Sequence, residues 1–469
     1  MSQFMPARRH EELGDAFYDR VAPIDFPRTI LRHRDQRWAR RLGLDMLDET
    51  RWLAHFGRFE PLAGSLTQPL ALRYHGHQFR SYNPDLGDGR GFLFAQCIDP
   101  VDHRLLDFGT KGTGKTPWSR GGDGRLTLKG GVREVLATEM LEALGVYTSK
   151  SFSLVETGEQ LYRGDEPSPT RSAALTRLSH SHIRIGTFQR LAYLEDTENL
   201  ARLVDYCVAN YYPELADTPN KPAAFLEAVV AKVARLGAQW TAAGFVHGVL
   251  NTDNINMTGE SFDYGPWRFL PHYDPDFTAA YFDETGLYAF GRQPDTLAWN
   301  LTRLAECLVP VSSIEQLEPA LNTIWPRFRA ELPAQILRRL GLEPRALEQD
   351  GALVTAVFGF LSASQSPYEQ FFFDWRGGAL SSLRAARSPA AHHYASEAFR
   401  PVADLLELYG PSVDVNLDHA YFARTRPRTM LIDDVEAIWA PVAEADDWTA
   451  FENALSEIAQ MRDAYGIKP

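Results

Sequence analysis

The chain has 469 residues, of which 44% are hydrophobic and 23% are charged. These proportions are typical of a globular protein and exclude a disordered or collagen-like chain. The 61 acidic and 48 Lys or Arg side chains give a formal charge of −13, and a chain this acidic is a poor general binder of nucleic acid or of anionic membranes. Any phosphate ligand must therefore be bound by a local cluster of basic residues.

The cysteines and the N-terminal segment indicate the compartment. Cys97, Cys207 and Cys307 are isolated in the sequence, and no CxxC pair occurs, which disfavours structural zinc and a disulfide framework and fits a reducing environment. The first residues lack the apolar core of a signal peptide. No run of about 18 uncharged apolar residues occurs that would span a membrane. We therefore expect a cytoplasmic protein that binds neither membrane nor nucleic acid.

The first part of the chain is predicted to be rich in strands. After residues 1–80, which mix short helical patterns with Pro- and Gly-marked turns, one helix is expected, because apolar residues at helical spacing begin near Leu126 and Gly145 ends the pattern. Strands are predicted over residues 92–98, 103–108, 151–156, 160–164 and 172–179.

The second part of the chain is predicted to be helical. A helix is expected over about residues 223–243, and helices dominate again from about Thr296. Between them, residues 245–265 are predicted to form a short strand, a polar loop and a hairpin that turns at Thr258-Gly259. Residues of the types that commonly bind metals and phosphates lie where the strand-rich part and the helical part of the chain meet. This order predicts an α+β, two-lobed nucleotide-binding fold with its cleft between the lobes.

Residues 109–116, Gly-Thr-Lys-Gly-Thr-Gly-Lys-Thr, match the GxxxxGK[ST] pattern of a P-loop. A P-loop needs a helix that opens at the Lys-Thr pair, and Pro117 disfavours helical geometry at Thr116. No apolar strand that ends in a metal-binding Asp follows. The P-loop fold is therefore disfavoured, and contact of these residues with phosphate in another architecture stays open.

Asn254 and Asp263 form a candidate metal-binding pair. Mg²⁺ prefers hard oxygen donors and keeps waters and substrate phosphates as further ligands. The two residues stand at the two ends of the predicted hairpin and supply an amide and a carboxylate oxygen. The alternative is an Asx-rich turn that binds no ligand.

Four charged residues suggest a phosphate-binding cluster. Lys111 ends a predicted strand and Glu134 lies on the next helix, and a strand Lys held by a helix Glu is how kinase-like folds position a Lys against nucleotide phosphates. Arg177 and Arg184 are able to clamp phosphates bidentately. The alternative for all four residues is that they are solvated surface charges.

Four long segments, in the same order, resemble the selenoprotein O family: residues 72–91, 111–136, 175–190 and 247–266. The resemblance implies an α+β, protein-kinase-like two-lobed fold with a β-rich N-lobe, a mostly helical C-lobe and N- and C-terminal extensions. It places an N-terminal extension at 1–80, the N-lobe at 81–195 and the C-lobe at 196–469, with the catalytic and metal-binding loop at 247–265.

The resemblance also implies the activity. The family transfers AMP from ATP to Ser, Thr or Tyr hydroxyls of proteins, with pyrophosphate as the leaving group, and holds ATP in a flipped orientation relative to kinases. It lacks the usual catalytic Asp two residues after the loop His, and here Val249 follows His247 at that spacing. ATP, protein substrates and self-modification are therefore the expected partners, and Mg²⁺ or Mn²⁺ the expected cofactor.

Site residues are carried over from the family motif by motif. Asp253 resembles the proton acceptor, and a neighbouring cation is expected to favour its ionised form. Asn254 and Asp263 resemble the metal ligands, and Glu134 resembles the partner of the phosphate lysine. The residues that resemble nucleotide contacts are Gly87, Gly89, Arg90, Lys111, Asp123, Gly124, Arg177 and Arg184.

Two other functions stay open beside adenylyl transfer: a conventional ATP-dependent phosphotransferase, and a non-catalytic ATP-binding pseudokinase scaffold. Retention of Lys111, Glu134, Asn254 and Asp263 favours chemistry over a scaffold. Another donor such as UTP, and hence uridylyl transfer, is not excluded. Family members commonly carry a selenocysteine or cysteine close to the C-terminus, whereas the last cysteine here is Cys307, so redox control by a terminal thiol is not expected.

Overall fold

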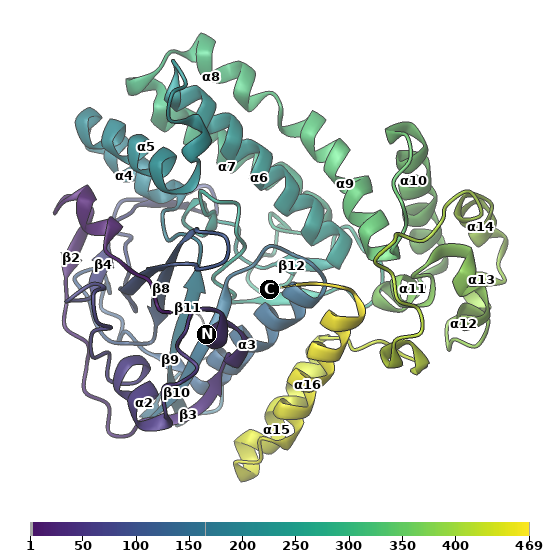
Figure 1. The fold of residues 1–469 in the computed structure, drawn as a ribbon, viewed down its shortest axis with the longest axis horizontal. Coiled ribbons are helices and arrows are strands. Elements are labelled where there is room, and N and C mark those ends of the chain that lie inside the picture. The colour runs from purple at the N-terminus through teal and green to yellow at the C-terminus, as the bar shows by residue number, and fades with distance from the viewer. Residues whose placement is uncertain (1–2, 165, 469) are drawn as a thin grey trace.

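The computed structural model describes residues 3–164 and 166–468. Within these ranges the protein is a mixed α and β fold in which strands gather in the N-terminal part and helices form most of the rest (Figure 1). A nine-stranded antiparallel sheet has the order β2-β4-β7-β8-β11-β10-β3, with β1 paired to β7 and β9 paired to β11. Its strands are β1 (Pro6–Ala7), β2 (Tyr18–Arg20), β3 (Ile30–Arg34), β4 (Leu70–Leu72), β7 (Leu93–Ile98), β8 (Leu105–Lys111), β9 (Leu126–Thr127), β10 (Lys150–Leu161) and β11 (Thr170–Ser179).

The predicted strands are present, with one difference in their number. Residues predicted as two separate strands, 151–156 and 160–164, belong mainly to the single strand β10. The register of β10 against β11 shifts between Glu156 and Gln160, and Gly158 lies in that interval with φ of 75°. A bulge at glycine therefore interrupts the sequence pattern without ending the strand.

The sheet buries both of its faces, because alternate side chains of a strand point to opposite sides. On β7, Leu93 packs into the core that contains α3 (Leu128–Ala143). Phe94, and Phe92 directly before the strand, pack into a second core with Trp52. That second core includes residues of the short helices α1 (Gln36–Arg41) and α2 (Glu49–Phe56).

Helix α3 crosses one face of the sheet. The Thr127 side chain accepts a hydrogen bond from the backbone N–H of Gly130 at 3.1 Å and caps the helix, and Gly145 follows its end with φ of 78°. Gly131 allows close approach to β10, since a Cβ built there would lie 2.4 Å from a methyl carbon of Leu154. The predicted helix is therefore confirmed, with a start at Leu128 because Leu126 and Thr127 pair with β11 as β9.

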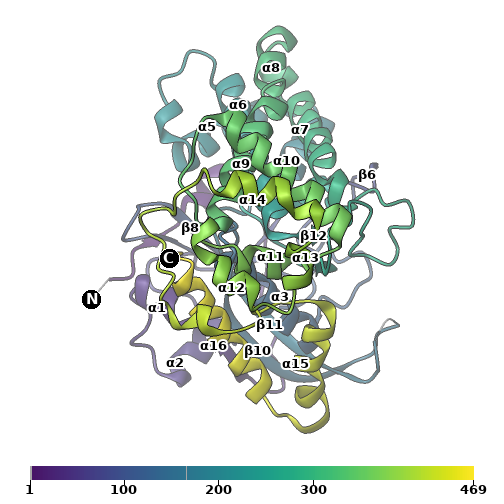
Figure 2. The ribbon, with the colours of Figure 1, turned by 90° about the vertical axis from the view of Figure 1, so that its right-hand side faces the viewer.

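Helices dominate the described chain as far as Ala464, as predicted. Figure 2 shows the helices between Ile324 and Leu406, labelled α9 to α14, on the side away from the sheet. Helices α15 and α16, between Ile432 and Ala464, lie in contact with α3. The remaining helices are α4 (Ile185–Tyr193), α5 (Thr197–Tyr211), α6 (Lys221–Ala243), α7 (Gln293–Leu308), α8 (Ile314–Leu321), α9 (Ile324–Leu340), α10 (Leu347–Ser364), α11 (Tyr368–Asp374), α12 (Ser382–Ala386), α13 (Ala391–Tyr394), α14 (Arg400–Leu406), α15 (Ile432–Ala445) and α16 (Thr449–Ala464). None of the helices in the described ranges has the length and apolarity needed to cross a membrane.

The predicted hairpin at Thr258-Gly259 is wrong. The strand β12 (Phe245–His247) pairs instead with β13 (Trp267–Phe269), beyond the loop. In the loop, the side chain of Asn256 donates to the carbonyl of Ser181 and accepts the N–H of Thr258. Side-chain hydrogen bonds thus replace the ladder that a hairpin requires.

The path of the backbone after β8 excludes the P-loop architecture. After β8 the chain runs without a helix until α3 begins at Leu128, so no helix opens at Lys115. The sheet is antiparallel throughout its described pairs, whereas a P-loop belongs to a parallel βαβ unit.

Candidate nucleotide-binding site

A cavity of about 680 Å³ lies where three loops meet. One loop precedes β7, the second connects β8 to α3, and the third follows β12. Eight of the residues predicted from the sequence line this cavity: Gly87, Gly89, Arg90, Asp123, Gly124, Asp253, Asn254 and Asp263. The fold therefore gathers residues that lie far apart in the chain into one concave site.

Lys111 stands at the end of β8, beside this cavity. Its Nζ lies 2.5 Å from Oε1 of Glu134 on α3 and 2.8 Å from Oδ1 of Asp263. Lys111 is 3% exposed and Glu134 is 1% exposed. The alternative of two solvated surface charges is therefore wrong, because the Lys–Glu pair is buried and joins the sheet, α3 and the loop after β12.

Arg177 and Arg184 are also buried rather than on the surface. The Nη1 atom of Arg177 lies 3.0 Å from Oδ1 of Asp263. The Arg184 guanidinium lies over the ring of Tyr74 at 4.2 Å, and its Nη1 donates to the backbone carbonyl of Asp253 at 3.3 Å. Neither arginine is among the residues that line the cavity, so in this structure both support its wall from behind.

Asp263 is the acidic centre of this cationic group. Burial alone would raise the pKa of its carboxyl, but Lys111, Arg177 and Arg90 outweigh that effect and hold the pKa well below its usual value. Its backbone has φ of 64°, in the left-handed region that Asp tolerates better than most residues. The carboxylate is therefore ionised at neutral pH and fixed in position.

Asp253 lies in a different environment. Burial raises the pKa of its carboxyl to about 6, and Arg184 opposes that shift only in part. Its Oδ1 atom is buried without a hydrogen-bond partner in the described part of the chain. This shift arises from the protein's own residues, so the predicted effect of a bound cation on the ionised form of Asp253 stays a prediction.

Gly76, in the short strand β5 (Gly76–Gln78) that pairs with β6 (Ser81–Asn83), explains how Asp253 reaches this position. A Cβ built on Gly76 would lie 2.9 Å from Oδ1 of Asp253. Only glycine leaves this space free, because a contact that short requires the carboxylate to move.

The oxygen atoms of Asn254 and Asp263 suit a hard divalent cation. The Asn254 Nδ2 donates to the carbonyl of Val249 at 2.9 Å, which orients the amide, and Oδ1 is buried without a partner in the described chain. No group of three or more His, Cys, Asp or Glu that could hold a metal is found among the described residues. Mg²⁺ does not require such a group, since it keeps waters and phosphates as ligands.

Several cavity residues were missed from the sequence. The indole of Trp118 packs on Gly87, where a built Cβ would lie 2.4 Å from Trp118 Cγ. Tyr74, Gln78 and Asn251 also line the cavity. An aromatic residue inside a Gly-rich loop was an available signal for Trp118, whereas the other three carry no local pattern that marks them.

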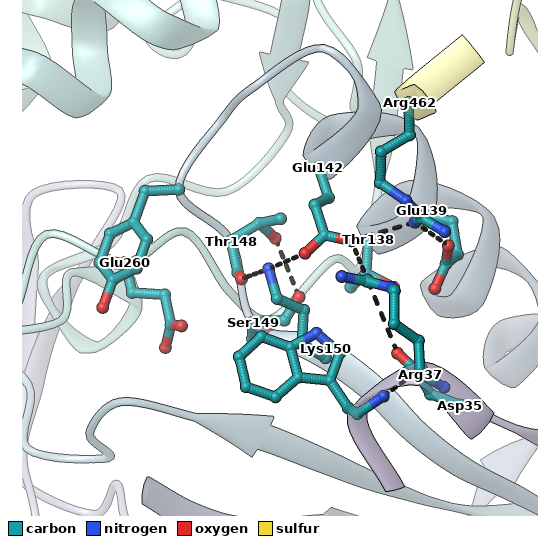
Figure 3. Close-up of polar contacts among 12 residues, drawn as sticks. Asp35, Arg37, Thr138, Glu139, Glu142, Thr148, Ser149, Lys150, Glu260 and Arg462 are labelled. Carbon is teal, nitrogen blue, oxygen red and sulfur yellow. Dashed lines mark hydrogen bonds and ion pairs between the residues drawn. The ribbon is translucent and has the colours of Figure 1, made fainter. Parts of the chain in front are cut away.

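A second cluster anchors the far end of α3 (Figure 3). Glu142 accepts hydrogen bonds from Arg37 of α1 and from Arg462 of α16, and it pairs with Lys150 of β10 at 2.9 Å. Arg462 also donates to Glu139 at 2.8 Å. Because α3 carries Glu134, these contacts connect the C-terminal helix to the position of Lys111.

Comparison with known proteins identifies the family. Residues 2–459 match the model of the family described as protein adenylyltransferase SelO. A protein of Gloeobacter violaceus called protein nucleotidyltransferase YdiU is 45% identical over 97% of this chain and 94% of its own length. The protein of the same name from a Synechocystis strain is 42% identical over 96% of each chain. The chain therefore belongs to the SelO family of nucleotidyltransferases.

Proposed function

We propose that this protein is an adenylyltransferase that transfers AMP from ATP to Ser, Thr or Tyr hydroxyls of proteins, including its own, and releases pyrophosphate. The main support for this proposal is that Asp253, Asn254 and Asp263 line one cavity. Lys111 and its partner Glu134 lie beside that cavity. Family membership supports the same reaction, since the matching family model is described as a protein adenylyltransferase.

The proposed architecture is protein-kinase-like with two lobes. It has an extension at residues 1–80, an N-lobe at 81–195 and a helical C-lobe at 196–469, with the catalytic loop at 247–265. The large sheet with α3 and the cavity at the junction with the helical part support this division. Strands β1 to β4 come from the first 80 residues and join the same sheet, so the extension is proposed to act as part of the N-lobe.

The basic residues are proposed to hold the phosphates. Lys111 offers an ammonium group fixed by Glu134, and Arg177 and Arg184 contribute fixed positive charge behind the cleft. Charge that builds on the pyrophosphate leaving group is then stabilised by cations that need no reorganisation. The loop glycines Gly87 and Gly89 are proposed to let the loop pack closely against Trp118 and so shape the wall of the nucleotide cavity.

Asn254 and Asp263 are proposed to hold Mg²⁺ or Mn²⁺, which when bound neutralises phosphate charge that would repel the incoming oxygen. The unpartnered amide oxygen of Asn254 and the ionised carboxylate of Asp263 support this assignment. The amide is held ready by its hydrogen bond to the Val249 carbonyl.

Asp253 is proposed to accept the proton of the acceptor hydroxyl. The hydroxyl oxygen forms its bond to the α-phosphorus at the same time. The Asp253 pKa of about 6 leaves the carboxylate mostly ionised at neutral pH while making it more basic than an exposed Asp. Asp253 lines the cavity, and its carboxylate provides the accepting oxygen. The same contact orients the hydroxyl for in-line attack, which needs an approach of about 3 to 3.5 Å.

The alternatives are less well supported. The relatives are named as nucleotidyltransferases, so the pseudokinase scaffold is not borne out. A kinase reaction would use an Asp where Val249 stands. Cytoplasmic location and the absence of nucleic-acid and membrane partners stay predictions from the sequence.

Intact-mass spectrometry tests the proposal. The protein is incubated with ATP and Mg²⁺ or Mn²⁺, with UTP in a parallel sample, and a Ser-containing acceptor protein is added. We expect a gain of one AMP moiety on the acceptor or on the protein itself. A gain of a phosphate, or no gain at all, would contradict adenylyl transfer, and a gain only with UTP would reassign the donor.

A further inference from the structure

A second groove, of about 440 Å³, adjoins the nucleotide cavity. The two hollows have in common Arg90, Arg125, Arg163, Gly265 and Pro266. Residues of α3, of β13 and of α15 line the groove, together with the segment that follows β13. A ligand in the groove would therefore lie next to one in the nucleotide cavity.

The groove is basic although the chain as a whole is acidic. Seven Lys or Arg side chains line it, against three Glu side chains, in a protein of formal charge −13. Several of these cations are already paired: Lys129 lies 2.8 Å from Glu436, and Arg125 lies 2.9 Å from Glu159.

Arg133 and Arg268 differ from these paired cations. Arg133, on α3, and Arg268, on β13, both donate to the backbone carbonyl oxygen of Trp267, at 3.3 Å and 3.0 Å. The two guanidiniums therefore lie close together. Neither forms an ion pair with a carboxylate of residues 3–164 and 167–468, although the charge of Glu436, which pairs with Lys129, acts on both. Burial is the main cause that lowers the pKa of Arg133 to about 10; the charge of Arg268 adds to this effect, and Glu436 and Glu134 act in the opposite direction. An anion placed between them would remove this repulsion and form charge-assisted hydrogen bonds.

An aromatic rim marks the same groove. Tyr281 and Phe282 line it and are 85% and 45% exposed, with ring centroids 5.2 Å apart. Exposed aromatic side chains beside a basic groove are typical of surfaces that bind polypeptide, since they give contact area at little cost in side-chain entropy. A free inorganic anion would use the arginines and not this rim.

We propose that the Arg133–Arg268 pair binds an acidic side chain of the acceptor protein, so that hydroxyls with a nearby Asp or Glu are the preferred targets. This inference rests on the proposed function, because it concerns the acceptor that receives AMP. Lys111 and Glu134 also line the groove; in this proposal Lys111 faces the nucleotide phosphates, and Arg133 and Arg268 hold the acidic residue of the acceptor. Tyr281 and Phe282 contact the backbone and apolar atoms of the same segment.

Peptide binding without ATP tests the proposal independently of AMP transfer. Two fluorescent peptides carry one central Ser flanked either by Glu or by Gln, and fluorescence anisotropy measures their affinity for the full chain. We expect the Glu peptide to bind more tightly. Arg268→Gln should weaken it by about 10-fold, the effect of one lost charge-assisted contact, and should leave the Gln peptide unchanged.

Two further variants complete the design. Arg133→Gln should reproduce the loss, which distinguishes the pair from an effect of one substitution. Arg329→Gln removes a charge from an exposed position of α9 outside the groove and should change nothing. Equal affinity of wild type for the two peptides, an equal loss with Arg329→Gln, or binding of inorganic phosphate by the pair without peptide binding would overturn the proposal.

The same peptides separate this inference from the proposed function. If the chain binds the Glu peptide through Arg268 but transfers no AMP to any acceptor, the groove assignment stands and the adenylyltransferase proposal fails. If AMP transfer occurs with equal KM for the Glu and Gln peptides, the reaction stands and the groove assignment fails.

Discussion

Replacing Asp263 tests how the cationic centre of the site is balanced. Its carboxylate lies 2.8 Å from Lys111 and 3.0 Å from Arg177, which are 3% and 6% exposed. Asp263→Asn keeps the size of the side chain and removes its charge. Lys111 then retains only Glu134 as a counter-ion, and Arg177 loses the one carboxylate with which it forms an ion pair in the described chain.

The expected loss of stability is moderate. Removing one partner of a fully buried ion pair costs about 3–5 kcal/mol. The Asp263 side chain is 26% exposed and Lys111 keeps one partner, so we expect a loss of about 2–3 kcal/mol in the free energy of unfolding. AMP transfer should fall by more than about 100-fold, because the site loses a fixed anion and a metal ligand.

Urea unfolding and AMP transfer measure the two effects separately. The folded-state pKa of Asp263 is depressed, so its stabilising contribution is complete above the usual pKa and is lost as pH falls through the folded-state value. The difference in unfolding free energy between wild type and Asp263→Asn should therefore stay constant above about pH 5 and shrink only in stronger acid. A folded variant with full transfer, or a difference in unfolding free energy that vanishes near neutral pH, would show that Asp263 does not have these roles.

Two further substitutions probe the support of the site. Gly76→Ala places a methyl group 2.9 Å from Oδ1 of Asp253 and should reduce kcat for AMP transfer by about 10-fold or more with ATP affinity retained; an unchanged kcat would show that Asp253 need not hold this position. Arg462→Gln removes the ion pairs to Glu139 and Glu142 and should lower the free energy of unfolding by about 1–2 kcal/mol, with Lys468→Gln as a control for loss of a positive charge. Equal urea midpoints for these two variants would contradict an anchoring role for α16.

Local sequence patterns were sufficient to predict much of the fold. The strands around β7 and β8 and the helix α3 follow from periodicity and from Gly145 as a stop signal. The hairpin at Thr258-Gly259 failed because Asn256 satisfies backbone groups through its side chain, a tertiary effect that a turn signal does not reveal. The bulge at Gly158 divided one strand into two apparent strands for a similar local reason.

The residues of the candidate site and of the adjoining groove likewise divide into those that the sequence reveals and those that only the structure reveals. Lys111, Glu134 and Asp263 stand out because their residue types at strand ends, on a helix and in a loop suggest phosphate chemistry, and the structure places them in contact. Arg133 and Arg268 lie 135 positions apart in the chain and converge only through the packing of α3 on the segment that contains β13. No spacing rule connects them, so three-dimensional structure was needed to find the pair.

The position of the label in ATP distinguishes adenylyl transfer from phosphoryl transfer. Wild type and Asp253→Asn are incubated with a Ser-containing acceptor, a divalent metal and ATP labelled at either the α- or the γ-phosphorus. We predict that wild type transfers α label to protein hydroxyls, that γ label leaves with pyrophosphate, and that Asp253→Asn binds ATP but transfers little label. Transfer of γ label to protein with release of ADP would contradict this prediction.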